Sequence, residues 1–67
     1  MLIYHRYVSG KDVVKKLQEE GWIIKRQKGS HVHMTNGTLN TTVPVHGNKD
    51  LPKGTVKAIE RQTGVKL

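Results

Sequence analysis

The sequence predicts a small α+β fold in which one helix, three antiparallel strands and a second helix follow one another. Three observations lead to it: an amphipathic stretch at residues 10–20, an extended Thr/Val-rich centre broken by two glycine turns, and a second amphipathic stretch ending at Gly64. A chain of 67 residues holds one domain with a thin core. We therefore expect residues 1–67 to form a single domain whose two helices cover one face of the sheet.

The first helix is expected to run from about Gly10 to Glu20. Ser9 and Asp12 have the spacing of a capping box, in which each side chain accepts a hydrogen bond from the other residue's amide. Gly21 is expected to end the helix in the left-handed backbone conformation. The ring of Trp22, the next residue, can then pack against the last turn of the helix. Residues 1–7 precede this core and are expected to be a flexible leader.

Three strands are predicted for the centre of the chain, at residues 22–27, 30–35 and 38–45. Gly29 supplies the first turn, and Asn36-Gly37 is a strong hairpin signal for the second. Alternation along the strands then divides the side chains between the two faces.

The apolar set of this alternation is expected to face the helices; it consists of Val32, Met34, Leu39, Val43 and Val45. His31 and His33 fall on the other set of positions. Both imidazoles are therefore expected to point away from the helices, toward solvent or a ligand.

The second helix is expected to begin near Pro52, whose missing amide proton costs little at an early helical position. Asp50 is the predicted N-cap. Val56 and Ile59 are spaced to face inward, and Gly64 ends the helix.

Twelve Lys and Arg residues against five Asp and Glu residues give a net charge of +7, which favours binding to polyanions. No acidic residue occurs at positions 21–49, so the predicted sheet has no carboxylate that would repel a phosphate. The absence of cysteine excludes disulfides and thiolate zinc sites and fits a reducing cytoplasm. No apolar run is long enough to cross a membrane.

His31 is the candidate catalytic residue. It lies two positions after Gly29, which leaves room for a close-approaching backbone. It also follows the cations Lys25, Arg26 and Lys28. An imidazole titrates near neutrality and can take a proton from a ribose 2′-hydroxyl or give one to a departing 5′-oxygen. These features predict general acid–base cleavage of RNA.

Residues expected to contact the RNA lie around this histidine and along the second helix. Lys53, Lys57 and Arg61 recur every four residues as a basic ridge, for which a solvated helix surface is the alternative. The full set of expected RNA contacts is Lys25, Lys28, Gly29, Ser30, His33, Lys53, Lys57 and Arg61.

Other interpretations of the same residues remain open. His31 and His33 alternate on one strand and could hold a metal ion with His46 as third ligand, although zinc normally needs four donors or three and water. The charge and the fold would equally serve a non-catalytic module that binds double-stranded RNA. We favour the enzyme and expect neither a metal nor another cofactor.

Four stretches of the chain resemble the HicA toxin family in order and spacing. They are VSGKDVVKKLQEEGW, RQKGSHVHM, TTVPVHGNKDLPKGTV and IERQTGV. The resemblance implies a fold like that of double-stranded-RNA-binding domains, and it makes His31 of the Gly-Ser-His motif the catalytic residue.

Members of this family are toxins of type II toxin–antitoxin systems that cleave mRNA and thereby inhibit translation and growth. The resemblance therefore implies a metal-independent endoribonuclease with an mRNA substrate. It also implies a HicB antitoxin that covers the active-site face, with a higher-order toxin–antitoxin complex as a further expectation.

Overall fold

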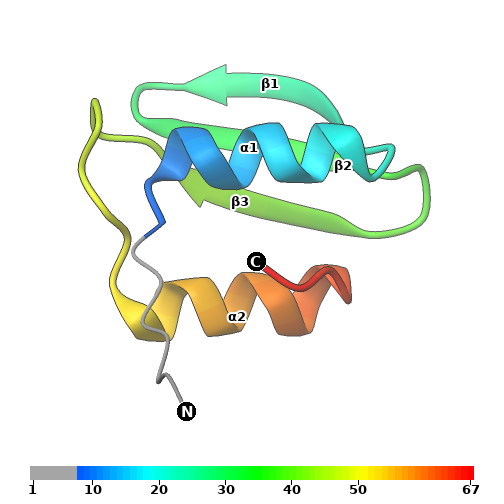
Figure 1. Cartoon of the computed structure of the whole chain (residues 1–67). Coiled ribbons are helices and arrows are strands. Elements are labelled where there is room, and N and C mark those ends of the chain that lie inside the picture. Colours follow the sequence, from blue (N-terminus) through cyan, green and yellow to red (C-terminus); the bar gives the residue numbers. More distant parts are fainter. Residues whose placement is uncertain (1–7) are drawn as a thin grey trace, which may run out of the picture.

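Along the chain, a helix is followed by a three-stranded antiparallel sheet and then by a second helix (Figure 1). The computed structural model describes residues 8–67, and the expected leader at residues 1–7 lies outside them. The elements are α1 (Gly10–Glu19), β1 (Ile23–Lys28), β2 (His31–Thr35), β3 (Asn40–Pro44) and α2 (Lys53–Thr63), with the strands in the order β1-β2-β3. The predicted α-β-β-β-α fold, like that of double-stranded-RNA-binding domains, is confirmed.

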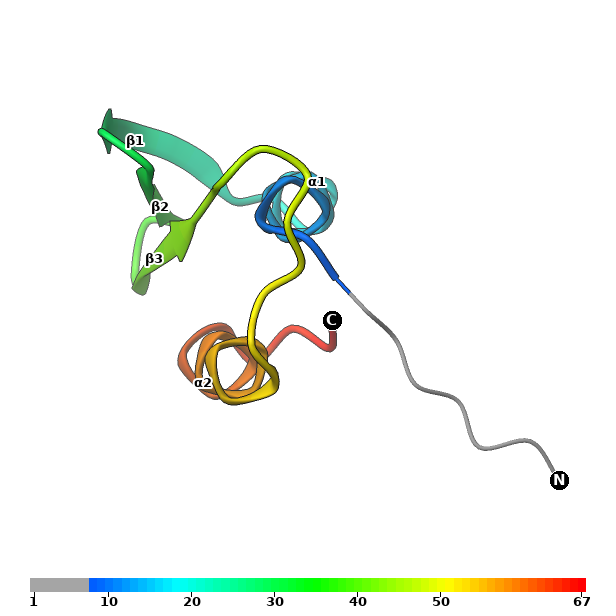
Figure 2. The same cartoon turned by 90° about the vertical axis from the view of Figure 1, so that its left-hand side faces the viewer.

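Both helices lie on the same side of the sheet, as Figure 2 shows, and both contact β3. The core between them and the sheet is formed by Val8, Val13, Leu17, Trp22, Val32, Met34, Val43 and Ile59. All six residues of β1 are exposed, because this edge strand lies beyond the cover of the helices. The side of the sheet that faces away from the helices is called the open face below.

Hydrogen bonds at both ends of α1 confirm its predicted boundaries to within one residue. The Asp12 amide donates to the Ser9 hydroxyl, and the Ser9 amide donates to the Asp12 carboxylate, each over 3.2 Å. At the other end the Trp22 amide donates to the Leu17 carbonyl over 2.9 Å, and Gly21 has a φ of 95°. The side chains of Trp22 and Leu17 are both buried, which completes the Schellman ending.

The loop between β2 and β3 corrects the prediction for Leu39. Four residues, 36–39, form this loop, and the Asn36 side-chain oxygen accepts from the amides of Thr38 and Leu39 over 2.9 and 2.7 Å. The loop therefore holds Leu39 outside the strand, where its side chain is 44% exposed. The expectation that Leu39 belongs to the core is wrong, because the two hydrogen bonds accepted by the Asn36 side chain stabilise a longer turn.

The start of α2 also differs from the prediction. Pro52 is the N-cap residue, the helix begins at Lys53, and no side chain caps it. Asp50 instead forms an isolated antiparallel bridge with Ser9, so its backbone is extended. The expected N-cap role of Asp50 is wrong, because pairing with the residue that caps α1 keeps Asp50 away from the helix.

The end of α2 is as predicted. Gly64 has a left-handed backbone with a φ of 75°, and its amide donates to the Glu60 carbonyl over 2.8 Å. Ile59 is buried, and Val65 packs against the core beyond the glycine. The Leu67 amide donates to the Glu60 carboxylate over 2.7 Å, which ties the following residues back to the helix.

Helix α1 begins in direct contact with the end of β3, and this contact requires a glycine. A Cβ atom on Gly10 would overlap the Pro44 carbonyl oxygen and lie 2.9 Å from the Val45 Cα. Both of these neighbours are backbone atoms, which cannot rotate away as a side chain would. Gly10 therefore sets how closely α1 approaches the sheet.

We expect Gly10→Ala to lower the free energy of unfolding by about 1–3 kcal/mol, as overpacking does in cores. Gly54→Ala is the matched control, because a Cβ at Gly54 in α2 meets nothing within 4 Å. That control should leave stability unchanged or raise it by up to about 1 kcal/mol. Urea unfolding of both variants measures the difference, and equal stability of the two would contradict the close approach at Gly10.

Candidate functional site

Three rows of side chains cross the open face of the sheet, as the strand register shows. The rows are Lys28–His31–Pro44, Arg26–His33–Thr42 and Ile23–Thr35–Asn40. Directly opposed residues of an antiparallel pair share a face, with Cβ atoms about 5 Å apart. The two histidines therefore lie in neighbouring rows, each beside a cation of β1.

His31 is the first residue of β2, and its side chain is exposed. The hairpin that precedes it has Gly29 and Ser30 as its two turn residues; Gly29 has a φ of 58°, and Ser30 has no positive φ. This is the pattern of a type II′ turn, which has glycine at its first central position. The Ser30 carbonyl accepts from the Val45 amide over 2.7 Å, which fixes the turn to the segment after β3.

A β-bulge at Lys25 determines which side chains of β1 reach the open face. The register passes from Ile24, opposite Met34, to Arg26, opposite His33, so Lys25 is the extra residue. In a bulge two residues of one strand oppose a single residue of the other, and here both Lys25 and Arg26 line the groove beside His33. Lys25 and Arg26 therefore lie on the same face as His33, and Lys28 reaches the row of His31.

Without this extra residue the alternation would place Arg26 and Lys28 on the helix side of the sheet, since Ile24 faces that side. The inserted position therefore collects the three cations of β1 on one surface. Lys25, Arg26 and Lys28 are all exposed.

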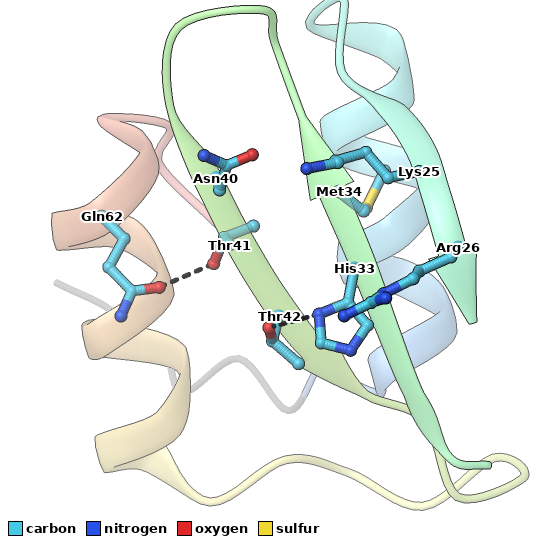
Figure 3. A pocket seen from close by; sticks show the side chains of 8 residues that line it. All are labelled: Lys25, Arg26, His33, Met34, Asn40, Thr41, Thr42 and Gln62. Carbon is cyan, nitrogen blue, oxygen red and sulfur yellow. Dashed lines mark hydrogen bonds between the residues drawn. The ribbon is translucent and has the colours of Figure 1, made fainter. Parts of the chain in front are cut away.

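A groove of about 620 Å³ runs over this surface beside His33, and Figure 3 shows its side chains. It is lined by Lys25, Arg26, His33, Met34, Asn40, Thr41, Thr42 and Gln62. The Thr42 hydroxyl lies 3.1 Å from Nδ1 of His33 and forms a hydrogen bond with it. At the rim the Thr41 hydroxyl donates to the Gln62 side-chain oxygen over 2.7 Å, which connects α2 to the groove.

The open face carries positive charge without a carboxylate on the same sheet. All acidic residues of the described chain lie before Gly21 or after Lys49. The ion pair found within residues 8–67 joins Lys16 of α1 to Glu20, its C-cap residue, over 3.9 Å. The charges of Lys25, Arg26 and Lys28 are therefore available to an anion.

The structure brings together one part of the predicted RNA-binding set and separates the other. Around His31 lie the five predicted contacts of the first hairpin and its strands: Lys25, Lys28, Gly29, Ser30 and His33. Lys53, Lys57 and Arg61 are exposed on α2, and none of them lines the groove. α2 contributes Gln62 to the groove instead.

In the part of the chain that the structure describes, no group of side chains is placed to bind a metal ion, as the metal alternative would require. No three His, Asp or Glu side chains among residues 8–67 come close enough to hold one ion. His46 lies in the loop after β3 and lines a separate hollow with Pro44 and Asp50. In the same residues, no helix is both long and apolar enough to span a membrane.

The sequence indicates Arg26 as a cation near His31 but not as an RNA contact, and it gives no role to Thr42, although both residues line the groove. Arg26 shares a row with His33, and Thr42 orients its ring. The run of three cations within residues 25–28 was the only available signal. A regular strand would divide these cations between two faces, so the bulge could not be inferred from alternation.

A comparison with protein families finds a match that spans residues 10–65. The family model is described as the HicA toxin of bacterial toxin-antitoxin. No curated protein and no solved structure matches the chain. The matched residues include both helices and all three strands.

We expect Gly29→Ala to lower the free energy of unfolding by about 1 kcal/mol, since a positive φ strains an L-residue. A chain synthesised with D-alanine at position 29 is the matched control, because D-residues favour this conformation. The Cβ of an L-residue at Gly29 meets nothing within 4 Å, so the loss in Gly29→Ala comes from backbone strain and not from packing. Thermal unfolding should rank D-alanine above L-alanine; the reverse order would rule out the assigned turn.

Proposed function

The chain belongs to the HicA family of bacterial toxin–antitoxin toxins, and from this we propose that it is an endoribonuclease that cleaves mRNA and inhibits translation and growth. One observation carries the proposal: His31 is exposed on the open face of the sheet, in the same row as Lys28. An imidazole beside a cation, with no carboxylate on the sheet, suits a phosphodiester substrate.

In the proposed reaction His31 transfers protons and no covalent enzyme intermediate forms. The ribose 2′-oxygen attacks the adjacent phosphorus and gives its proton to a base, while the bond from phosphorus to the 5′-oxygen breaks and that oxygen receives a proton. The imidazole of His31 serves at one or both of these transfers. General acid–base catalysis of this kind contributes about 10²- to 10⁴-fold to the rate.

The residues around His31 bind and orient the RNA in this proposal. Lys28 lies opposite His31 and stabilises the additional negative charge on phosphorus. Gly29 and Ser30 form a tight turn that lets the RNA backbone come close, and Lys25 and His33 contact it further along the open face.

The ridge on α2 is proposed to contact RNA outside the cleaved segment. Lys53, Lys57 and Arg61 are exposed and lie outside the groove. They would therefore contribute through charge to the salt-dependent part of the affinity.

Because the chain belongs to a family of toxin–antitoxin toxins, its partner is an antitoxin. We propose that this partner is a HicB protein that covers the open face and so blocks access to His31. A partner with acidic residues would match the cations of β1. The toxin would act on mRNA in the cytoplasm, alone or released from a higher-order complex with its antitoxin.

We expect His31→Ala to abolish cleavage of a labelled transcript and to remove growth arrest, because Lys28 and Pro44, the other members of the row, provide no imidazole for proton transfer. His31→Gln should be equally inactive, since glutamine keeps hydrogen bonding but cannot transfer the proton. Because His31 is exposed, thermal unfolding of both variants should match that of the wild type. Retained cleavage in either variant rules out the assignment.

The same experiment separates the enzyme from a non-catalytic module that binds double-stranded RNA. Such a module would leave the transcript intact in the wild type and bind it with the same affinity after His31→Ala. Its binding would also weaken as salt rises, which alone does not distinguish the two functions.

We expect cleavage to continue in EDTA, because the described residues do not assemble three ligands for a metal ion. The measurement is the initial rate of cleavage with and without the chelator at constant ionic strength. A rate that EDTA abolishes and added zinc restores would make the reaction metal-dependent.

A further inference from the structure

The groove over the Arg26–His33–Thr42 row lies next to His31 but takes no part in the proton transfers proposed there. We infer that it is a second phosphate subsite, which holds the phosphodiester one nucleotide away from the one that is cleaved. Lys25 and Arg26 bind this phosphate in the subsite. The inference rests on the proposed function for the location of the cleaved bond.

The spacing of the rows matches successive phosphates of one RNA strand. His31 and His33 are two residues apart on β2, which corresponds to about 6.6 Å along the strand. This is close to the backbone length of one nucleotide in an extended single strand. A strand of RNA that runs along β2 therefore presents one phosphate to each row.

The bulge gives the second row more positive charge than a regular strand could. Lys25 and Arg26 are consecutive, yet both reach the open face opposite His33. Arginine binds phosphate with two parallel N–H groups, whereas lysine adds a compact positive charge. The pair can therefore bind two oxygens of one phosphate, and no carboxylate on the sheet competes for them.

His33 is held in a fixed orientation at this subsite. Its Nδ1 forms a hydrogen bond with the Thr42 hydroxyl over 3.1 Å, and the residue is half-buried. The Nε2 atom then remains for a contact with the bound nucleotide, at its phosphate or its 2′-hydroxyl. A ring oriented by a neighbouring hydroxyl contributes to binding without losing much further rotational freedom.

The subsite ends at the third row. Ile23, Thr35 and Asn40 carry no charge, so a third phosphate along the same path finds no cation. The open face is therefore built for two consecutive phosphates: one at His31 and Lys28, the other at His33 with Lys25 and Arg26.

Binding of short uncleavable RNAs tests the subsite independently of catalysis. We would measure fluorescence anisotropy with 2′-O-methyl oligonucleotides that contain one, two or three phosphates. The wild type should bind the oligonucleotide with two phosphates about tenfold more tightly than the one with a single phosphate, which corresponds to one charged hydrogen bond. A third phosphate should raise the affinity little further. Arg26→Ala and Lys25→Ala should each remove most of the gain from the second phosphate.

Lys15→Ala is the matched control, because it removes one positive charge from an exposed position of α1. This variant should keep the full gain from the second phosphate. Thermal unfolding of all three variants checks that the exposed substitutions leave the fold intact. If Arg26→Ala and Lys25→Ala keep the same gain as Lys15→Ala, the subsite is overturned.

Cleavage kinetics separate a failure of the subsite from a failure of the proposed function. Arg26→Ala should raise KM about tenfold and leave kcat near that of the wild type, whereas His31→Ala should abolish kcat. If the wild type cuts no RNA but gains affinity with the second phosphate, the endoribonuclease proposal fails and the subsite stands. If the wild type cuts RNA but Arg26→Ala leaves KM unchanged, the subsite fails and the enzyme stands.

Discussion

Packing of both helices against β3 is the constraint on which the rest of the structure depends. The chain has enough apolar side chains for one core, and they lie between β3, β2 and the two helices. Gly10 permits α1 to contact the backbone of Pro44 at the end of β3, and the Thr41 hydroxyl donates to Gln62 of α2 near the start of the same strand. With its helices placed there, the fold leaves one face of the sheet and all of β1 to solvent.

That arrangement explains why the charged and polar side chains of the candidate site lie on the surface of the sheet and not in a deep pocket. A thin core cannot bury a charged site, because an unpaired buried charge would cost more than such a core provides. Side chains on an open face avoid that cost, and their positions are set by strand register. His31 and His33 are held by the same ladder that aligns Val32 and Met34 with the core.

Local signals in the sequence predicted the elements well. The Ser9–Asp12 capping box and the Gly21–Trp22 ending depend on residues within one turn of each other, and both are present in the structure. The side of β2 that carries the histidines was also predictable, because Val32 and Met34 must be buried.

Three features of the structure were not predictable from such local signals. Asp50 is extended because it pairs with Ser9, forty-one positions earlier in the chain. Leu39 is exposed because the Asn36 side chain bonds two amides of the loop. The place of Arg26 in the candidate site follows from a bulge that strand periodicity does not reveal.

The exposure of β1 has a consequence for how copies of this protein behave toward one another. An edge strand with unpaired backbone groups is a template for intermolecular pairing and aggregation, and here Ile23 and Ile24 are 62% and 44% exposed on it. Lys25, Arg26 and Lys28 follow in the same strand, so two such edges that met would bring like charges together. The cations that attract a polyanion thus also act as gatekeepers of solubility, and a bound anion that neutralises them removes this electrostatic protection.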